Sequence, residues 1–319
     1  MSENFGWTIE KMAPLWASRS LPELAPGWAT LQTELAGVCG TDLQMLRGYA
    51  NFDGFLGHEF VARVIECDRP EWIGRRVVGE INVGCGSCAD CQAGDPRFCP
   101  GRTVLGIRGL DGCFAERFRL PLTNLYQVDD LDPHQAVFAE PLAAALEAGI
   151  HLLPGREVLV LGDGRLGSLI ALALREKHPV TVLGRHREKL ERLKALGLSI
   201  CQQTSGLWPI VVEATGSAGG RQQALRVCRP QGTVVLKSTV AESAELDINL
   251  VVVNAINLLG SRCGRFEPAL QALRSGTVDP RPLIDQILDL NEFPQALQSR
   301  GFKTLLRGPA GSGGPAASR

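Results

Sequence analysis

Four cysteines lie close together in the sequence, at Cys85, Cys88, Cys91 and Cys99, with the spacing C-x2-C-x2-C-x7-C. Four thiolates at such spacing can close a tetrahedron around Zn²⁺ with no open position, which is how structural zinc is held. An iron–sulfur cluster or the zinc ribbon of a nucleic-acid-binding protein also uses four thiolates, but the remaining motifs favour structural zinc. We therefore predict a zinc-stapled lobe over residues 84–100.

A second set of possible metal ligands is dispersed along the chain. Cys39 lies in Gly-Val-Cys-Gly-Thr-Asp, His58 in Gly-His-Glu and Glu140 in Ala-Glu-Pro. Three protein ligands and one exchangeable oxygen are typical of a catalytic zinc, which keeps a position for substrate. Each residue alone has a simpler explanation: a core thiol, an interior histidine, or a carboxylate that favours a helix N-terminus. Their combination favours a catalytic zinc site.

A glycine-rich turn follows a short apolar run at residues 158–161. Gly162, Gly164 and Gly167 form G-x-G-x-x-G between this predicted strand and a predicted helix, which is the context of a dinucleotide-binding turn. The helix N-terminus would supply N–H donors to a pyrophosphate, and Arg165 and Leu166 lie within the same turn. The alternative is that these glycines only mark a strand–helix turn.

The end of the next predicted strand bears on which dinucleotide is bound. Proteins that bind NAD place an Asp or Glu about twenty residues after the glycines, whereas this chain has Gly184-Arg185-His186-Arg187. Because guanidinium groups bind phosphate in a bidentate manner, Arg185 and Arg187 favour NADP over NAD. The alternative is that both arginines are solvated and do not touch the coenzyme.

Two kinds of element must position these residues. Up to about residue 126 the chain has short apolar runs between Gly, Pro and Asp turns, for example at 60–65 and 75–78, which indicates an irregular β-rich domain. After a predicted helix at 140–148, apolar runs at 158–161, 180–183, 210–214 and 233–236 alternate with helical patterns at 166–177, 188–196 and 221–229. Such alternation predicts a doubly wound parallel sheet with right-handed crossovers.

Composition excludes several classes of protein. The 319 residues include 33 basic and 34 acidic side chains, which gives a net charge of −1. Of all residues, 45% are hydrophobic. This balance fits about two globular domains and gives no basic surplus for a nucleic acid. The start of the chain does not resemble a signal peptide, and no uninterrupted apolar run is long enough for a bilayer, so we expect a cytoplasmic protein. The cysteines outside the two sites are predicted to be buried thiols: Cys67, Cys113, Cys201, Cys228 and Cys263.

In this order the motifs resemble those of the zinc-dependent medium-chain dehydrogenase/reductase superfamily, which includes alcohol, sorbitol and threonine dehydrogenases. The resemblance extends from about residue 31 to residue 307. It implies a GroES-like β-rich catalytic domain at 1–141, a Rossmann dinucleotide-binding domain at 142–262, a return to the catalytic domain at 263–307 and a disordered tail at 308–319. The active site is expected between the two domains.

The resemblance also implies roles for single residues. Cys39 and His58 match zinc ligands, Glu140 matches the third-ligand position, and Glu59 is expected to alternate with Glu140 or water on the metal. Asp42 matches the carboxylate that orients the ligand imidazole. This chain therefore resembles the polyol-type relatives, which have Glu rather than Cys at the third position.

Four further positions take their interpretation from the family. Thr41 matches the hydroxyl that hydrogen-bonds the substrate oxygen and relays its proton, while Thr215 and Lys303 match positions near the coenzyme. Many relatives have a His three residues after that threonine to pass the proton to solvent, but this chain has Gln44. An amide has no titration near neutral pH, so proton release must follow another route, through water or Glu59.

The resemblance implies hydride transfer between NADP(H) and an alcohol or polyol, or the corresponding carbonyl, assisted by one catalytic and one structural zinc ion. NADPH-dependent aldehyde reduction and a catalytically silent, coenzyme-binding relative are the alternatives. We expect a homodimer or homotetramer that binds neither nucleic acid nor membrane. Several residues after Thr41 could line a substrate pocket or belong to the core or surface: Arg47, Tyr49, Phe52, Phe55 and Arg108.

Overall fold

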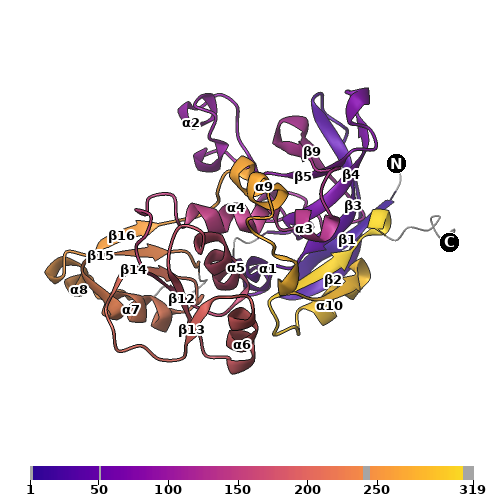
Figure 1. Ribbon diagram of the computed structural model, residues 1–319. Helices are drawn as coiled ribbons and strands as arrows, with labels where there is room; N and C mark the ends of the chain where they lie inside the picture. The colour runs from indigo at the N-terminus through magenta and orange to yellow at the C-terminus, as the bar shows by residue number, and fades with distance from the viewer. Residues whose placement is uncertain (1–2, 50–51, 240–244, 312–319) are drawn as a thin grey trace. The chain divides into compact units, whose positions relative to one another are not determined.

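The computed structural model describes residues 3–49, 52–239 and 245–311. The chain forms two compact units, one made of Met1–Glu140 with Arg281–Arg319 and the other of Pro141–Pro280 (Figure 1). The first unit is therefore discontinuous in sequence and the second is inserted into it. Across the described residues, no helix is both long and apolar enough to cross a membrane.

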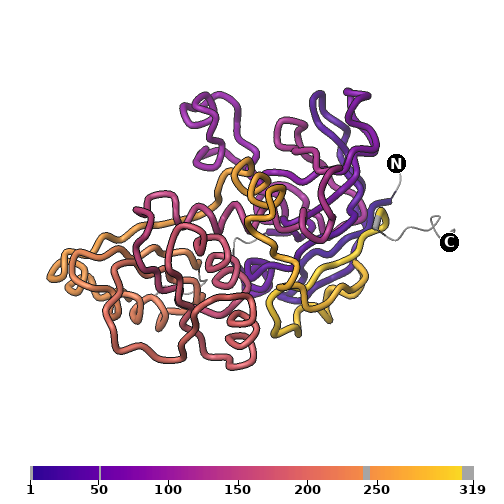
Figure 2. The backbone as a smooth tube through the Cα atoms, viewed as in Figure 1, coloured from indigo at the N-terminus to yellow at the C-terminus, as the bar shows by residue number. Residues whose placement is uncertain are grey.

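The first unit is built on a mostly antiparallel sheet, in which only β17 and β18 of the described strands pair in parallel, and its middle combines distant parts of the chain. Within the described residues its seven strands run β10-β5-β4-β3-β18-β17, with β9 also paired to β3. The C-terminal strand β18 thus lies against β3 from the N-terminal region, and the tube in Figure 2 shows yellow segments beside indigo ones. These strands are β3 (Trp28–Gly37), β4 (Glu59–Cys67), β5 (Arg76–Gly79), β9 (Arg117–Pro121), β10 (Leu125–Gln127), β17 (Ile284–Asp289) and β18 (Lys303–Arg307).

Smaller elements complete this unit. A hairpin of β1 (Glu3–Glu10) and β2 (Ala13–Ser20) is fixed by Trp7, whose indole nitrogen donates to the carbonyl of Leu290 at 2.6 Å and whose ring lies 5.8 Å from that of Phe293. A small sheet joins β6 (Asn82–Val83), β7 (Thr103–Leu105) and β8 (Gly109–Leu110). The helices are α1 (Gly40–Met45), α2 (Ala89–Gln92), α3 (Pro133–Ala136) and α10 (Phe293–Ala296), with 3-10 turns η2 (Pro70–Trp72), η3 (Pro96–Phe98), η4 (Leu122–Asn124), η5 (Arg281–Leu283), η6 (Leu290–Glu292) and η7 (Pro309–Gly311).

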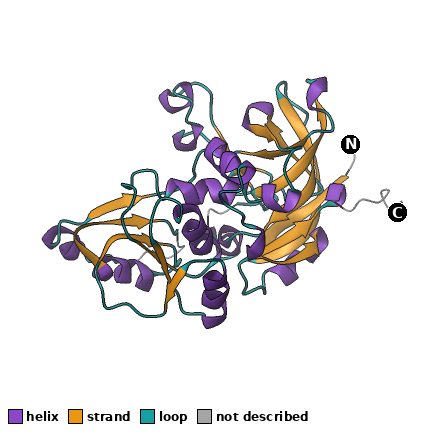
Figure 3. Ribbon diagram, in the orientation of Figure 1, coloured by secondary structure: helices purple, strands orange, loops and turns teal. Residues whose placement is uncertain are grey.

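The second unit has a six-stranded parallel sheet within its described residues, in the order β13-β12-β11-β14-β15-β16. This is the strand order of a Rossmann fold, with the switch point between β11 and β14. The strands are β11 (Val158–Leu161), β12 (Val180–Leu183), β13 (Ser199–Cys201), β14 (Trp208–Glu213), β15 (Cys228–Leu236) and β16 (Asn257–Gly260). The helices, purple beside the orange strands in Figure 3, are α4 (Ala139–Glu147), α5 (Arg165–Leu174), α6 (Arg187–Ala195), α7 (Ala218–Val227), α8 (Ile248–Val253) and α9 (Phe266–Arg274).

Burial explains why these runs form the central strands. All four residues of β11 are buried, as expected for a parallel strand covered on both faces. Helix α5 buries eight consecutive residues from Gly167 to Leu174 and contacts β11 and β12. The predicted GroES-like β-rich domain and doubly wound parallel sheet are confirmed.

The unit boundaries differ from the expected ones at the second crossing. The structure returns to the first unit at Arg281, not at residue 263. Helix α9 belongs to the second unit and buries Phe266 and Leu270 on one face, and a Cβ at the preceding Gly264 would lie only 1.9 Å from the carbonyl oxygen of Ala143. The expected tail also begins later than predicted: Gly308 donates to the carbonyl of Glu34 and Pro309–Gly311 form a turn against β3. Residues 312–319 lie outside the described residues.

Candidate functional site

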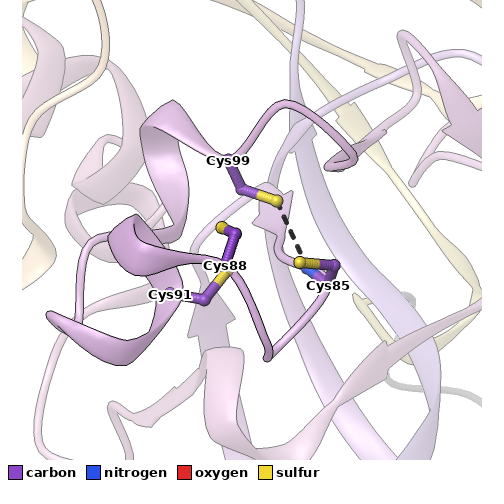
Figure 4. Close-up of side chains that lie close together, drawn as sticks. All are labelled: Cys85, Cys88, Cys91 and Cys99. Carbon is purple, nitrogen blue, oxygen red and sulfur yellow. Dashed lines mark hydrogen bonds between the residues drawn. The ribbon is translucent and has the colours of Figure 1, made fainter.

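The four clustered cysteines converge in a lobe of the first unit. Their sulfur atoms all lie within 4.8 Å of one another, and Figure 4 shows the four side chains gathered around one point. Four sulfurs at the corners of a zinc tetrahedron would be about 3.8 Å apart, given a Zn–S bond of about 2.3 Å. A hydrogen bond of 3.4 Å from the backbone N–H of Cys85 to the sulfur of Cys99 would persist with a thiolate. The donor set therefore fits a closed, structural zinc site.

One of these thiols is already biased towards its metal-binding form. Hydrogen bonds from Ser87, through its hydroxyl and its backbone, lower the pKa of Cys85 to about 6. A thiol with a lowered pKa is deprotonated more readily, and the thiolate is the metal ligand. The turn at Ser87 therefore favours the thiolate of Cys85, whereas burial raises the pKa of Cys91 to about 12.

A second donor cluster joins Cys39, His58 and Glu59. One ligand atom from each lies within 4.8 Å of the others. The three come from two elements, because Cys39 precedes α1 and His58 directly precedes β4, which begins at Glu59. His58 and Glu59 are buried. A half-buried thiol, a buried imidazole and a buried carboxylate brought together fit the donor chemistry of a catalytic zinc.

Asp42 links the two halves of this cluster. One of its carboxylate oxygens accepts the backbone N–H of Cys39 at 2.8 Å, at the start of α1, and the other lies 3.5 Å from Nδ1 of His58. Burial raises the pKa of Asp42, which the nearby His58 charge opposes. Burial would lower the pKa of His58, but the negative charges of Asp42 and Cys39 raise it well above its usual value. A carboxylate on Nδ1 leaves Nε2 as the metal-binding nitrogen.

Glu59 has a cationic partner from the far end of the chain. The ammonium of Lys303, at the start of β18, lies 2.5 Å from the Glu59 carboxylate and 3.5 Å from the carbonyl of Val38. It also lies 5.6 Å from the centre of the Phe138 ring. Lys303 and Glu59 are 5% and 1% exposed, so each charge depends on the other. The contacts of Lys303 are thus at the donor cluster; its coenzyme contact stays a prediction.

Two other predicted site residues are related to this cluster: Thr41 contacts one of its members, and Glu140 affects it through its charge. The sulfur of Cys39 and the hydroxyl of Thr41 are 3.6 Å apart. Glu140, near the start of α4, is outside the donor cluster, although its charge contributes to the raised pKa of His58. Among the described residues the structure therefore brings together Cys39, His58 and Glu59, which are three of the four expected ligands, while zinc ligation by Glu140 stays a prediction.

The glycine turn has the predicted context in the second unit. Gly162 follows β11 with a φ of 119°, and α5 begins at Arg165. A Cβ at Gly167 would lie 2.1 Å from the carbonyl oxygen of Gly162, so only glycine allows the helix this close to the turn. A Cβ at Gly164 would meet no atom within 4 Å, which leaves open space beside the helix N-terminus. The turn fits a dinucleotide pyrophosphate.

Asp163 within this turn was not predicted to have a role. Its carboxylate accepts the backbone N–H of His186 at 2.7 Å and lies 2.9 Å from the His186 imidazole, after β12. Arg185 and Arg187 flank that histidine and are exposed. The signal in the sequence was an Asp between two glycines of the turn together with Gly184 at the strand end.

The remaining predictions have mixed outcomes. Thr215 donates through its backbone N–H and hydroxyl to the buried carboxylate of Glu213, at 2.7 and 2.6 Å, at the end of β14. Phe55 is fully buried and therefore a core residue, while Arg47 and Arg108 are exposed. Of the cysteines predicted to be buried thiols, Cys113 and Cys228 are buried, whereas the others are only partly so: Cys67, Cys201 and Cys263.

Comparison with known proteins agrees with this architecture. Residues 25–130 match the family described as the alcohol dehydrogenase GroES-like domain. The chain is 31% identical over 301 residues to an uncharacterized zinc-type alcohol dehydrogenase-like protein of Haemophilus influenzae, covering 86% of this chain and 87% of that one. It is 28% identical over 324 residues to an L-threonine 3-dehydrogenase of Streptomyces avermitilis, covering 89% and 93% of the two chains.

Solved structures are similar over nearly the whole chain. One is a candidate zinc-binding dehydrogenase of Sinorhizobium meliloti bound to NADP, with a TM-score of 0.85, 25% identity and coverage of 96% and 100% of the two chains. Another is the Escherichia coli alcohol dehydrogenase RspB complexed with NADH, with a TM-score of 0.87, 25% identity and the same coverage.

A GroES-like domain, a Rossmann sheet and two zinc-type donor sets together define a zinc-dependent, nicotinamide-linked dehydrogenase. The chain belongs to the zinc-type alcohol dehydrogenases of the medium-chain dehydrogenase/reductase superfamily.

Proposed function

We propose that this protein transfers a hydride between NADP(H) and an alcohol or polyol, or the corresponding carbonyl. The observation that carries the proposal is the cluster of half-buried Cys39 with buried His58 and Glu59, in a chain that also has a dinucleotide turn. Threonine 3-dehydrogenases among the relatives oxidise a secondary alcohol, as their name states, and a likeness to them supports a substrate with neighbouring polar groups.

The side chains of the cluster have distinct proposed tasks. Cys39 and His58 hold the metal, with Glu59 or Glu140 as the third ligand. Bound zinc supplies Lewis-acid stabilisation of the substrate oxygen, and the nicotinamide ring accepts or gives the hydride. Asp42 orients His58 through charge, because its carboxylate lies 3.5 Å from Nδ1.

Two further side chains handle charge and protons in this proposal. The Thr41 hydroxyl, 3.6 Å from the Cys39 sulfur, takes the proton of the substrate hydroxyl during oxidation and returns it during reduction. Lys303 neutralises Glu59 while that carboxylate is off the metal, because their charges are 2.5 Å apart. Gln44 cannot titrate near neutral pH, so water or Glu59 carries the proton onward.

The coenzyme proposal rests on the segment after β12. Gly184 stands where an NAD-binding protein has a carboxylate, and exposed Arg185 and Arg187 can meet a 2′-phosphate. The proposed contacts also include Arg165, Leu166 and Thr215. One similar structure binds NADP and another NADH, so both coenzymes belong in the test.

Turnover measured together with metal content tests the proposal. The purified chain is assayed with NADP(H) and NAD(H) against polyols, simple alcohols and aldehydes, and we expect two zinc ions per chain and faster turnover with NADP(H). His58→Ala should remove activity and one zinc, whereas the exposed His151→Ala should change neither.

Other outcomes separate the alternatives. Turnover of aldehydes alone would favour a reductase, and no turnover by the fully metallated chain across the panel would favour a silent, coenzyme-binding relative. The proposal includes a homodimer or homotetramer in the cytoplasm, which size-exclusion chromatography and cell fractionation would check.

A further inference from the structure

The glycine turn contains a carboxylate that is directed at the end of the neighbouring strand. Asp163 lies between Gly162 and Gly164, and its side chain is only 8% exposed. One oxygen accepts the backbone N–H of His186 at 2.7 Å, and the other lies 2.9 Å from Nδ1 of the same residue. The His186 ring itself is 64% exposed. A buried anion thus fixes an exposed imidazole.

Asp163 and the residue at position 184 compete for the same space. A Cβ at Gly184 would lie 2.4 Å from a carboxylate oxygen of Asp163 and 2.5 Å from its Cβ. Gly184 directly follows β12, where NAD-binding Rossmann proteins place the acidic residue that hydrogen-bonds the ribose 2′-hydroxyl. A carboxylate from the glycine turn thus lies beside position 184. The proposed preference for NADP(H) therefore depends on the positive charges of Arg185 and Arg187, which must outweigh this carboxylate.

The charge of this carboxylate is maintained in the folded protein. Burial would raise the pKa of Asp163, but hydrogen bonds from His186 and the positive charges of His186 and Lys189 outweigh burial and lower it. The segment after β12 adds the exposed guanidinium groups of Arg185 and Arg187. A carboxylate and basic residues of the same segment thus occur at the strand end where the adenosine ribose is expected.

We propose that Asp163 and His186 act as an opposed pair that determines selectivity at the ribose 2′ position of the coenzyme. Asp163 accepts a hydrogen bond from a free 2′-hydroxyl and disfavours a 2′-phosphate, while His186, with the arginines, attracts that phosphate. The inference rests on the proposed binding of a nicotinamide dinucleotide and adds the residues that discriminate between its two forms.

Two small ligands isolate this effect from the rest of the coenzyme. Adenosine 2′,5′-bisphosphate and 5′-AMP differ only in the 2′-phosphate, so the ratio of their dissociation constants on the full-length chain measures selectivity by calorimetry. Asp163→Asn removes the anion but keeps an oxygen acceptor, and should shift the ratio towards the bisphosphate by roughly three- to tenfold. His186→Asn keeps a donor in place of Nδ1 and should shift it the other way by a similar factor.

The opposite directions in which the two variants should shift the ratio distinguish an effect of charge from an effect of structure. A purely structural role would weaken both ligands equally and leave the ratio unchanged, which would overturn the inference. Glu191→Gln is the matched control, because it removes one exposed anion further along α6 and should leave the ratio nearly constant. Because the His186 ring is exposed, its variant tests the inference even if the Asp163 variant unfolds. If the unsubstituted chain bound neither small ligand and neither dinucleotide, the proposed function would be overturned as well. If both variants bound the ligands with an unaltered ratio, only this inference would be overturned.

Discussion

The buried ion pair between Lys303 and Glu59 makes a quantitative prediction about the donor cluster. Lys303→Met keeps an unbranched apolar stem next to Phe138 but leaves the Glu59 carboxylate, which is 1% exposed, without its cation. Removing one partner of a buried pair costs about 3–5 kcal/mol, because the remaining charge is desolvated and uncompensated. We expect the free energy of unfolding of the zinc-free protein to fall by that amount.

Urea unfolding followed by tryptophan fluorescence measures this cost, with and without saturating zinc. Zinc in the donor cluster would replace the lost cation, so the cost of Lys303→Met should be smaller when zinc is present. The contribution of the four-cysteine site is common to both proteins and cancels in the comparison. Lys194→Met, which removes an exposed ammonium from α6, is the control and should cost less than about 0.5 kcal/mol.

A double-mutant cycle tests the pairing itself. Glu59→Gln combined with Lys303→Met should cost at least about 1 kcal/mol less than the sum of the single changes, because the double variant leaves no uncompensated charge. A loss below about 1 kcal/mol for Lys303→Met in the zinc-free protein, or strict additivity in the cycle, would refute the reasoning.

Three further predictions concern the other parts of the site. Cys99→Ser should remove one equivalent of zinc and lower the thermal unfolding midpoint, while Cys67→Ser should not; unchanged metal content by elemental analysis would contradict this. Gln44→His should introduce a step near roughly pH 6.5 into the pH–rate profile, because imidazole titrates there; a profile identical to that of the parent chain would argue against a relay through this position. Gly164→Ala should keep the unfolding midpoint but weaken coenzyme binding roughly tenfold or more, because the methyl group fills the space for the pyrophosphate. Gly167→Ala should lower both the unfolding midpoint and the coenzyme affinity, because its Cβ would lie 2.1 Å from a backbone oxygen. Equal effects of the two variants in calorimetry and thermal unfolding would contradict these separate roles.

The central part of the parallel sheet was accessible from the sequence because its strands are largely buried on both faces. The runs at 158–161 and 180–183 coincide with β11 and β12, since a fully covered strand is a continuous apolar segment. The hairpin at Glu3–Glu10 and Ala13–Ser20 was not predicted. All eight residues of its second strand are exposed or half-exposed, so no buried apolar face marks it in the sequence.

The part of the site that depends on local spacing could be predicted from the sequence, whereas the part that depends on contacts between distant residues could not. The four cysteines act locally, and their convergence follows from their spacing. The pairing of Lys303 with Glu59 joins residues 244 positions apart, and the replacement of an acidic residue at 184 by Asp163 depends on two strands lying side by side. Only the folded structure shows that the carboxylate of Asp163 lies beside position 184.

The position of β18 between β3 and β17 has a consequence for how the protein is made. The inserted Rossmann unit is contiguous and can fold as soon as it leaves the ribosome. The first unit cannot close its sheet until β18 has been translated, and until then residues 35–37 of β3 lack their partner strand, a gap of the kind that can recruit foreign strands. The same strand delivers the ammonium that neutralises Glu59, so the donor cluster gains this partner only after residue 303 has been translated. A ribosome that stops after residue 280 would release a finished coenzyme domain attached to an incomplete, aggregation-prone half.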